Sequence, residues 1–443
     1  MAEVIKAAAQ AARKAALQLS QASHEARNNA LEAIAGALTA QSDKILEANA
    51  RDVKAAEAMV AVGKLGMPLL KRLKVDDAKL RDEMVVGIRS VASQEDPIGR
   101  TLAATELDQG LNLFRVSVPI GVIGVVFESR PDALVQIACL CLKSGNAVML
   151  KGGSEALHTN RALAEVMIAA TADLPGMPPG WMHLLEARED VTAILALHNL
   201  IDLIIPRGSN DLVQHIMSHT KIPVMGHADG ICHVYVDRDA DLAQARRIVM
   251  DSKTQYVSVC NAAETLLVHR DIAPAFLPDM ICAFQEAGVE VRGDTAVAHF
   301  GLGVVSATEA DWATEYLDMI ISVRVVDDLE AAIDHINTYG SHHTDAIITR
   351  DPVAASRFLR GVDSASVMHN ASTRFADGYR YGLGAEVGIS TVRLHSRGPV
   401  GLEGLVIYKY VVEGQGQIVS DYSGQDGKKF THRKLDAVWA PKQ

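Results

Sequence analysis

Cys260 is the residue whose surroundings best fit a chemical role. Residues 241–254 before it have helical spacing of apolar side chains, and residues 265–268 after it form an apolar run typical of a buried strand. A thiol in a short loop between two such elements can reach a substrate while a rigid scaffold holds it. The neighbours Ser258 and Asn261 are small or polar, so a carbonyl carbon can approach. Because a free cysteine is more often a small buried hydrophobic residue, this loop alone leaves both interpretations open.

Two further segments have the composition of anion-binding junctions between a strand and a helix. They are Lys151-Gly152-Gly153-Ser154 and Arg207-Gly208-Ser209. Free N–H groups and the helix dipole at such junctions favour a phosphate, and Lys151 adds a positive charge. Each segment is explained equally well as an ordinary capped helix. Two of them in one sheet, however, form the crevice that open α/β folds use for cofactors, so together they predict a dinucleotide site.

A thiol near a nicotinamide cofactor points to aldehyde oxidation or acyl reduction, because a thioester accepts hydride well. The backbone N–H of Cys260 is then the first expected donor to the oxyanion. Arginines in the glycine-rich region 370–409 are candidates to bind a phosphate or a carboxylate. They are Arg374, Arg393 and Arg397. A solvated loop with turn glycines explains the same region equally well.

The elements that must position these groups follow from hydrophobic patterning. Residues 4–95 have the three-and-four spacing of helices. Residues 100–118 alternate and have a turn at Asp108-Gln109-Gly110, which predicts a hairpin and a subunit contact. From residue 120 onward, apolar strands alternate with helices, and residues 222–225 and 232–236 are among the expected strands. This alternation predicts doubly wound parallel sheets.

Composition excludes several classes of protein. The chain has 443 residues, a net charge of −11 and 49% hydrophobic residues, which fits a globular protein of two or three domains and argues against nucleic acid as a main partner. No apolar run reaches the ~18 residues that a membrane helix needs. The five cysteines have no CxxC spacing, which favours a reduced, cytoplasmic chain. We expect no metal site, since the histidines lack ligand spacing and the neighbours His342 and His343 should point apart.

Several motifs resemble a known family. The run SVCNAAETLLVH around Cys260, together with AVMLKGGSEA, IDLIIPRGSND and residues 314–317, resembles the aldehyde dehydrogenase superfamily. Longer segments such as VFESRPDALVQIACLCLKSGNAVMLKGGSEA and PVMGHADGICHVYVD are similar, more narrowly, to the gamma-glutamyl phosphate reductase family. The resemblance covers about residues 5–425 and leaves the polar C-terminal segment outside.

The resemblance implies an α/β fold with two doubly wound domains and a small β oligomerisation element. The expected cofactor-binding domain comprises residues 1–100, 120–230 and about 393–404. The expected catalytic domain is 231–392, the β element is 101–119 with 405–425, and 426–443 is a polar tail.

The resemblance also implies an activity. It is the NADPH-dependent reduction of L-glutamyl 5-phosphate to L-glutamate 5-semialdehyde and phosphate through a cysteine thioacyl intermediate, the second step of proline biosynthesis from glutamate. NADP(H) is the implied cofactor, and a homo-oligomer (dimer or tetramer), functional coupling to glutamate 5-kinase and a cytoplasmic location are expected with it. A hydrolytic or coenzyme A-acylating aldehyde dehydrogenase and a non-catalytic member of the family are the alternatives.

Residue by residue, the resemblance makes Cys260 the nucleophile. Lys151, Gly152 and Ser154 would contact the adenosine ribose or phosphate of the cofactor, Gly208 and Ser209 its pyrophosphate, and Glu315 the nicotinamide ribose.

Two positions depart from the hydrolytic members. Their general-base glutamate falls at His227, and their oxyanion asparagine falls at Ser129. Ser129 would still donate to the oxyanion, and Asn261 beside the nucleophile completes the expected catalytic set. A hydrolytic enzyme must activate water to cleave its thioester, whereas an acyl phosphate reductase must not. The histidine at position 227 therefore favours phosphate, rather than water, as the partner of the thioacyl intermediate.

Overall fold

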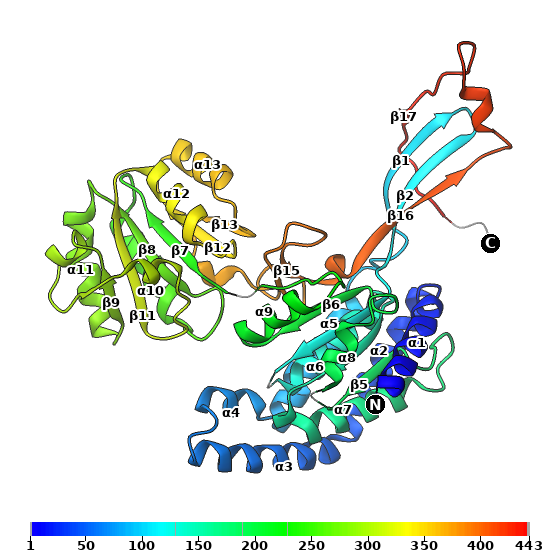
Figure 1. Cartoon of the computed structure of the whole chain (residues 1–443), viewed down its shortest axis with the longest axis horizontal. Coiled ribbons are helices and arrows are strands. Elements are labelled where there is room, and N and C mark those ends of the chain that lie inside the picture. The colour runs from blue at the N-terminus through cyan, green and yellow to red at the C-terminus, as the bar shows by residue number, and fades with distance from the viewer. Residues whose placement is uncertain (1, 129, 188, 228, 441–443) are drawn as a thin grey trace. The chain divides into compact units, whose positions relative to one another are not determined.

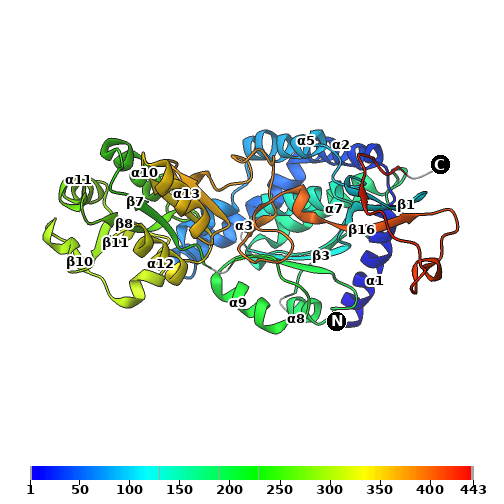
Figure 2. The same ribbon diagram turned by 90° about the horizontal axis from the view of Figure 1, so that it is seen from above.

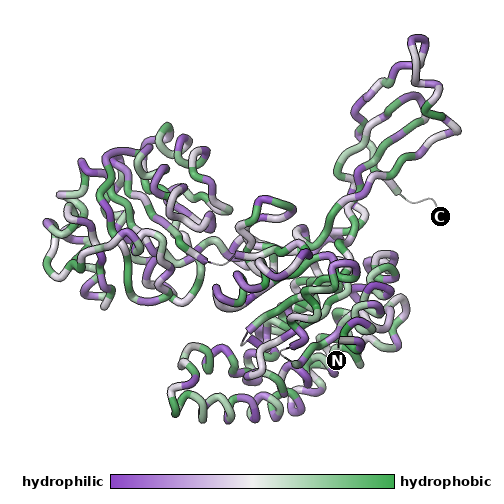
Figure 3. Tube along the Cα trace, viewed as in Figure 1, coloured by the Kyte–Doolittle hydropathy of each residue, from purple (hydrophilic) through white to green (hydrophobic). Residues whose placement is uncertain are grey.

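The computed structural model describes residues 2–128, 130–187, 189–227 and 229–440. The chain forms two compact units (Figure 1). Unit 1 comprises Met1–Met225, Leu383–Gly388 and Val400–Gln443, and unit 2 comprises Gly226–Gly382 and Ile389–Pro399. Apolar residues gather on the strands inside each unit (Figure 3). Within the described ranges, no helix has the length and apolar character needed to cross a membrane.

Unit 1 begins with helices, as the spacing of apolar residues predicts. They are α1 (Ala2–Leu19), α2 (His24–Ala40), α3 (Ser42–Ala61), α4 (Met67–Leu73), the π-helix η1 (Lys79–Val85) and α5 (Val86–Ser93). Leu31, Ile34 and Leu38 recur on one face of α2 and are fully buried. The hydroxyl of Ser23 caps α2 by accepting a hydrogen bond from the amide of Ala26 at 3.1 Å.

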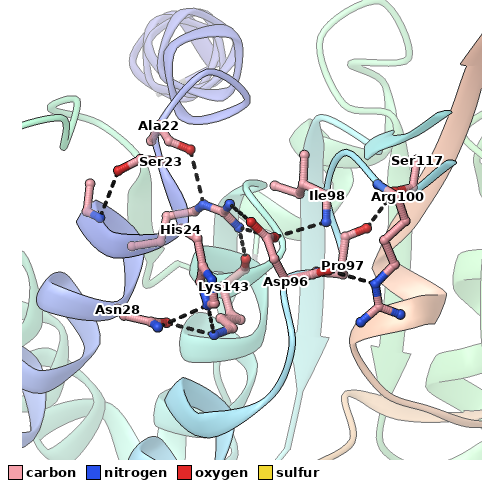
Figure 4. Close-up of polar contacts among 12 residues, drawn as sticks. Ala22, Ser23, His24, Asn28, Asp96, Pro97, Ile98, Arg100, Ser117 and Lys143 are labelled. Atoms are coloured by element: carbon pink, nitrogen blue, oxygen red, sulfur yellow. Dashed lines mark hydrogen bonds and ion pairs between the residues drawn. The ribbon is translucent and has the colours of Figure 1, made fainter. Parts of the chain in front are cut away.

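A buried polar network joins α2 to the end of α6 (Pro131–Lys143), as Figure 4 shows. Arg27 donates Nη2 to Asp96 Oδ2 at 2.8 Å and Nη1 to the carbonyl of Lys143. Lys143 Nζ in turn lies 2.7 Å from both His24 Nε2 and Asn28 Oδ1. Burial lowers the pKa of Lys143 to about 8. The network therefore satisfies buried polar groups that the two helices would otherwise leave unpaired.

The sheet of unit 1 has the predicted parallel alternation, with strand order β5-β4-β3-β6. The elements are β3 (Val122–Phe127), α6, β4 (Ala147–Lys151), η2 (Ser154–Ala156), α7 (Leu157–Thr171), β5 (Met182–Leu185), α8 (Glu189–Leu195), β6 (Leu203–Arg207) and α9 (Asn210–His219). The strand predicted at 222–225 is wrong, because that segment contributes only a single bridge between Ile204 and Val224. Pro223 in its middle has no amide hydrogen to extend a ladder.

A second sheet of unit 1 contains the predicted hairpin, with order β16-β2-β1-β17. Its strands are β1 (Thr101–Asp108), β2 (Leu111–Pro119), β16 (Val406–Glu413) and β17 (Arg433–Lys434). The turn uses Gly110 at φ 73°, a conformation that favours glycine. The C-terminal segment joins this sheet, because β17 pairs with β1 and the Trp439 amide donates to Thr101 Oγ1 at 2.8 Å. The polar composition of that segment hid this pairing, which uses backbone groups.

Unit 2 is built on a seven-stranded parallel sheet of order β10-β9-β11-β8-β7-β12-β13. Alternate residues of its strands face opposite sides. Helices α10 and α11 pack on one side and α12 and α13 on the other. Figure 2 gives a second view of these helices around the strands. The doubly wound architecture that the alternation predicts is therefore present.

The elements of unit 2 follow the chain in this order: β7 (Cys232–Val236), α10 (Leu242–Thr254), β8 (Ala263–His269), α11 (Ala273–Glu286), β9 (Glu290–Gly293), η3 (Val297–His299), β10 (Val305–Ser306), η4 (Glu309–Ala313), β11 (Ile320–Val326), α12 (Leu329–Tyr339), β12 (Thr344–Ile348), α13 (Pro352–Gly361), β13 (Ser366–His369) and η5 (Thr373–Phe375). The short strands β14 (Gly388–Ser390) and β15 (Gly398–Val400) pair with each other, and η6 (Leu402–Leu405) and η7 (Val419–Tyr422) flank β16.

The units differ in detail from the domain limits expected from the sequence. The first limit falls after Met225, near the expected limit at 230, and Ile389–Pro399 belongs to unit 2 although we assigned 393–404 to the cofactor-binding domain. Ion pairs explain the second difference, because Arg393 and Arg397 both contact Asp363 of unit 2.

Candidate active site

Cys260 lies in a turn between α10 and β8, as predicted from the pattern around it. Its side chain is partly exposed. The turn is closed by the amide of Ala262, which donates to the carbonyl of Val259 at 3.1 Å. The carbonyl of Cys260 itself accepts from Cys232 Sγ at 3.2 Å, so the first residue of β7 holds the backbone of the turn. The thiol is therefore both accessible and fixed, which nucleophilic catalysis requires.

Gly230 packs directly against this turn. A Cβ atom on Gly230 would lie 2.5 Å from the Cα and 2.6 Å from the Cβ of Cys260, and closer still to its carbonyl oxygen. Real Cβ atoms essentially never come nearer than 3.0 Å to such neighbours. The absence of a side chain at position 230 is therefore a condition for the observed position of Cys260.

Asn261 connects the turn to the segment that carries Arg374. Its Nδ2 donates to the carbonyl of Ala376 at 2.8 Å, and the side chain is 4% exposed. Arg374 is also buried, and its Nε donates to Gln255 Oε1 at 2.9 Å. Burial, and then repulsion from Arg380, lowers the pKa of the Arg374 guanidinium, while a negative charge on Cys260 acts in the opposite direction. The structure thus brings Cys260, Asn261 and Arg374 into one neighbourhood.

Two histidines also lie beside Cys260: His227, which the resemblance aligns with the general-base glutamate of hydrolytic members, and His343, which the sequence analysis did not place there. His227, His343 and Cys260 each offer one ligand atom, and these three atoms lie within 4.8 Å of one another. The strand order β8-β7-β12 explains this, because the three residues precede three adjacent parallel strands and so meet at one edge of the sheet. His342 points away and bonds the carbonyl of Asp363 at 2.7 Å. The side chains of His342 and His343 therefore diverge, as expected, and a ring nitrogen of His343 lies within 4.8 Å of the Cys260 sulfur.

Glu315 lies between η4 and β11, in a segment anchored to a buried ion pair. Lys253 Nζ contacts Glu264 Oε2 at 2.6 Å, and both side chains are fully buried. Glu264 Oε1 also accepts from the amide of Leu317 at 3.1 Å, which fixes the 314–317 segment. Burial raises the pKa of Glu264, and the charge of Glu315 contributes in the same direction. No sequence pattern indicated that Lys253 and Glu264 would pair.

The other expected cofactor residues lie in unit 1, at the carboxyl ends of β4 and β6. These strands flank β3, and the register sets Lys151 level with Val126 and Arg207 level with Phe127. Both junctions are therefore at one edge of the sheet, as predicted. Lys151 is buried, its Nζ donates to the carbonyl of Gly152, and burial lowers the pKa of its ammonium group. Ser154 opens η2, directly ahead of α7.

The N-terminus of α9 already attracts an anionic group. The amide of Ser209 donates to Glu128 Oε2 at 2.9 Å. A Cβ atom on Gly208 would lie 2.7 Å from the same oxygen, so a side chain here would displace the Glu128 carboxylate from its present position. The carboxylate of Glu128 therefore occupies the kind of position in which a helix N-terminus binds a phosphate.

The remaining predicted site residues are two arginines, which form ion pairs with Asp363, and Ser129. Arg397 Nη1 contacts Asp363 Oδ1 at 2.9 Å, Arg393 pairs with the same carboxylate, and these contacts hold the pKa of Asp363 below its usual range. Their role toward a substrate stays a prediction. Ser129 lies outside the described residues.

Comparison with known proteins identifies the family. The aldehyde dehydrogenase family profile matches residues 1–318. The chain is 56% identical over 442 residues to the gamma-glutamyl phosphate reductase of Natronomonas pharaonis, covering 100% of both chains, and 56% identical over 431 residues to that of Methanococcoides burtonii, covering 96% of both. This protein belongs to the gamma-glutamyl phosphate reductase group of the aldehyde dehydrogenase family. The first of these matches includes the C-terminal segment that the sequence resemblance left outside.

Solved structures agree with this assignment. The crystal structure of gamma-glutamyl phosphate reductase from Thermotoga maritima superposes with a TM-score of 0.90 at 39% identity, covering 94% of this chain and 99% of that one. An acetylating aldehyde dehydrogenase from Geobacillus thermoglucosidasius shares the fold, with a TM-score of 0.64 at 16% identity. The predicted fold class, two α/β domains of the aldehyde dehydrogenase type with an added β element, is confirmed.

Proposed function

We propose that this protein reduces L-glutamyl 5-phosphate to L-glutamate 5-semialdehyde and phosphate, with Cys260 as the covalent nucleophile. The observation that carries the proposal is the 56% identity over the whole chain to proteins named gamma-glutamyl phosphate reductase. The site supports it, because an accessible thiol stands in a fixed turn beside Arg374 and two histidines. On this view the protein acts in the proline branch of glutamate metabolism.

The first step is acyl transfer. The sulfur of Cys260, as thiolate, attacks the acyl carbon, a carbon–sulfur bond forms, and the bond from that carbon to the phosphate oxygen breaks. The amide of Cys260 would donate a hydrogen bond to the oxyanion. Arg374 offers a buried guanidinium to the departing phosphate, and its contact with Gln255 keeps the group oriented.

The residues of unit 1 fit a dinucleotide. The N-terminus of α9 holds a carboxylate through the amide of Ser209, next to a glycine that admits close approach, which is the chemistry a pyrophosphate needs. Gly208 and Ser209 would hold the pyrophosphate, and Lys151, Gly152 and Ser154 the adenosine side. In unit 2, Glu315 would hold the nicotinamide ribose. NADPH, when bound, supplies the hydride that reduces the thioester.

Collapse of the resulting hemithioacetal on Cys260 breaks the carbon–sulfur bond. Its hydroxyl proton leaves, the aldehyde is released and the thiolate is restored. His227 stands where hydrolytic relatives carry a general-base glutamate, and its Nδ1 bonds the carbonyl of Ile389 at 3.0 Å. That contact keeps the ring in place. Because position 227 carries an imidazole instead of a carboxylate, it does not supply the group that activates water in hydrolytic relatives.

The deciding experiment runs the reaction backwards. NADP reduction is measured with glutamate 5-semialdehyde, with and without inorganic phosphate, and then with NAD. Strict dependence on phosphate, with a preference for NADP, supports the proposal. Equal rates without phosphate would show that water resolves the thioester, and dependence on coenzyme A would assign an acylating dehydrogenase instead.

The assignments beyond the reaction belong to the same proposal. Unit 1 serves as the cofactor-binding domain and unit 2 as the catalytic domain. The sheet of β1, β2, β16 and β17 serves as an oligomerisation element, since β16 is an edge strand with exposed Ile407, Tyr408, Tyr410 and Val412. The five free cysteines favour a reducing cytoplasm. Functional coupling to glutamate 5-kinase would supply the reactive acyl phosphate directly.

A further inference from the structure

His343 has a feature that the proposed reaction does not explain. The side chain is fully buried, and its Nδ1 lies 2.9 Å from Thr344 Oγ1 and 3.7 Å from Cys232 Sγ. Its Nε2 is buried as well and has no hydrogen-bond partner among the described residues. A buried ring nitrogen left unpaired is unfavourable, so such a group calls for a ligand or a role.

The surroundings of His343 contain two further ligand groups. Cys260 Sγ and one ring nitrogen each of His227 and His343 lie within 4.8 Å of one another. The two imidazole rings meet edge to face, with centroids 4.9 Å apart and an interplanar angle of 73°. His227 Nδ1 donates to the carbonyl of Ile389 at 3.0 Å, which places the lone pair of the neutral ring on Nε2.

This donor set has the chemistry of a zinc site. One thiolate and two imidazoles are ligands that Zn²⁺ prefers, with a Zn–S bond of about 2.3 Å and Zn–N bonds of about 2.0–2.1 Å. In a tetrahedral site those lengths separate the ligand atoms by roughly 3.3–3.6 Å. The 4.8 Å limit on the present separations therefore leaves only small side-chain movements to complete the site.

The ligands also have second contacts of the kind that metal sites use. Ile389 O orients His227, and Thr344 Oγ1 orients His343. Such outer contacts fix the tautomer and the direction of each ring. All three ligands belong to unit 2 and enter from the edge at which β7, β8 and β12 begin.

We propose that Cys260, His227 and His343 form a binding site for a thiophilic divalent cation such as Zn²⁺, and that the bound ion inhibits the enzyme by capturing its nucleophile. On binding, the thiol proton passes to solvent and a metal–sulfur bond forms, with no change of oxidation state. The inhibitory consequence rests on the proposed role of Cys260 in the reaction. The inhibition is competitive with the acyl phosphate or the aldehyde and is reversed by a chelator.

Cobalt spectroscopy tests the site without relying on activity. Co²⁺ is titrated into the full-length protein, and the thiolate-to-cobalt charge-transfer absorption is recorded. We expect one Co²⁺ per chain with this band, no band in Cys260→Ala, and an affinity at least about tenfold lower in His227→Gln and in His343→Gln. The matched control is Cys282→Ser, because Cys282 is exposed and outside the cluster, and it should keep the band.

The results that overturn the site are a missing band in the wild-type protein or a band that persists in Cys260→Ala. If His343→Gln does not fold, His227→Gln decides, since His227 is only partly buried. Alkylation of Cys260 by iodoacetamide gives a second readout and should slow at least about tenfold with Zn²⁺ and recover with a chelator. Phosphate-dependent oxidation without a cobalt band would refute this site alone, whereas a cobalt band without that oxidation would refute the proposed reaction alone.

Discussion

Replacing Gly230 with alanine should disable the nucleophile without touching it chemically. The added methyl group would lie 2.5 Å from the Cα and 2.6 Å from the Cβ of Cys260, where ordinary contacts begin at 3.4 Å. The obstructing atoms include the backbone, so rotation of a side chain cannot relieve the clash. The Cys260 turn, or the segment that carries Gly230, must move.

The size of the effect follows from these distances. Restoring an ordinary contact to the Cα atom needs a displacement of about 0.9 Å, from 2.5 to 3.4 Å. A misplacement of about 1 Å in a reacting group costs on the order of 10²-fold in rate. We therefore expect Gly230→Ala to lower kcat/KM about 10²-fold, mostly through kcat, because the cofactor-binding junctions lie in unit 1 and are unaffected.

The assay is phosphate-dependent NADP reduction with glutamate 5-semialdehyde, accompanied by thermal unfolding of each protein. Gly36→Ala is the matched control, since Gly36 lies inside α2 and an added Cβ meets no atom within 4 Å. That control should keep full activity and gain roughly 0.5–1 kcal/mol of stability, as expected for this change in a helix interior. Near wild-type kcat/KM in folded Gly230→Ala would refute the argument that this contact positions Cys260.

Further predictions address the other parts of the site and the core. Cys260→Ser should lower turnover by about 10³-fold or more in steady-state assays, and near-normal turnover would exclude a thioacyl intermediate. Arg374→Gln should weaken the use of phosphate about 10–100-fold, seen as a raised KM for phosphate in the oxidation assay. Lys253→Met should destabilise the protein by about 3–5 kcal/mol in denaturant unfolding because it leaves Glu264 buried without its partner, and Lys253→Met combined with Glu264→Leu should regain part of that loss. Burial lowers the pKa of Lys143 from 10.5 to about 8, so between these values the unfolded chain binds more protons, and this group makes stability rise with pH. Urea unfolding at several pH values should show a smaller rise in Lys143→Met, and an unchanged pH dependence would contradict this assignment.

Much of the fold could be predicted because it depends on local patterns. Helical spacing in residues 4–95 and the strand–helix alternation from residue 120 are set by which side chains must be buried, and both are confirmed. The same patterns placed Cys260 in a turn and Lys151 and Arg207 at the ends of strands. The strand predicted at 222–225 is wrong, because that segment forms only the single bridge between Ile204 and Val224, and Pro223 has no amide hydrogen to donate.

Only the tertiary structure decided which of these helices, strands and loops lie next to one another. The order β8-β7-β12 brings His227 and His343 to Cys260 from segments far apart in the sequence. No periodicity encodes the order of strands in a parallel sheet, because it follows from how helices cover the two faces. For the same reason the pairing of Arg393 and Arg397 with Asp363 and the addition of β17 to the hairpin were not visible in the sequence. The sequence thus determined the elements and the candidate nucleophile Cys260, whereas packing determined the groups that surround it.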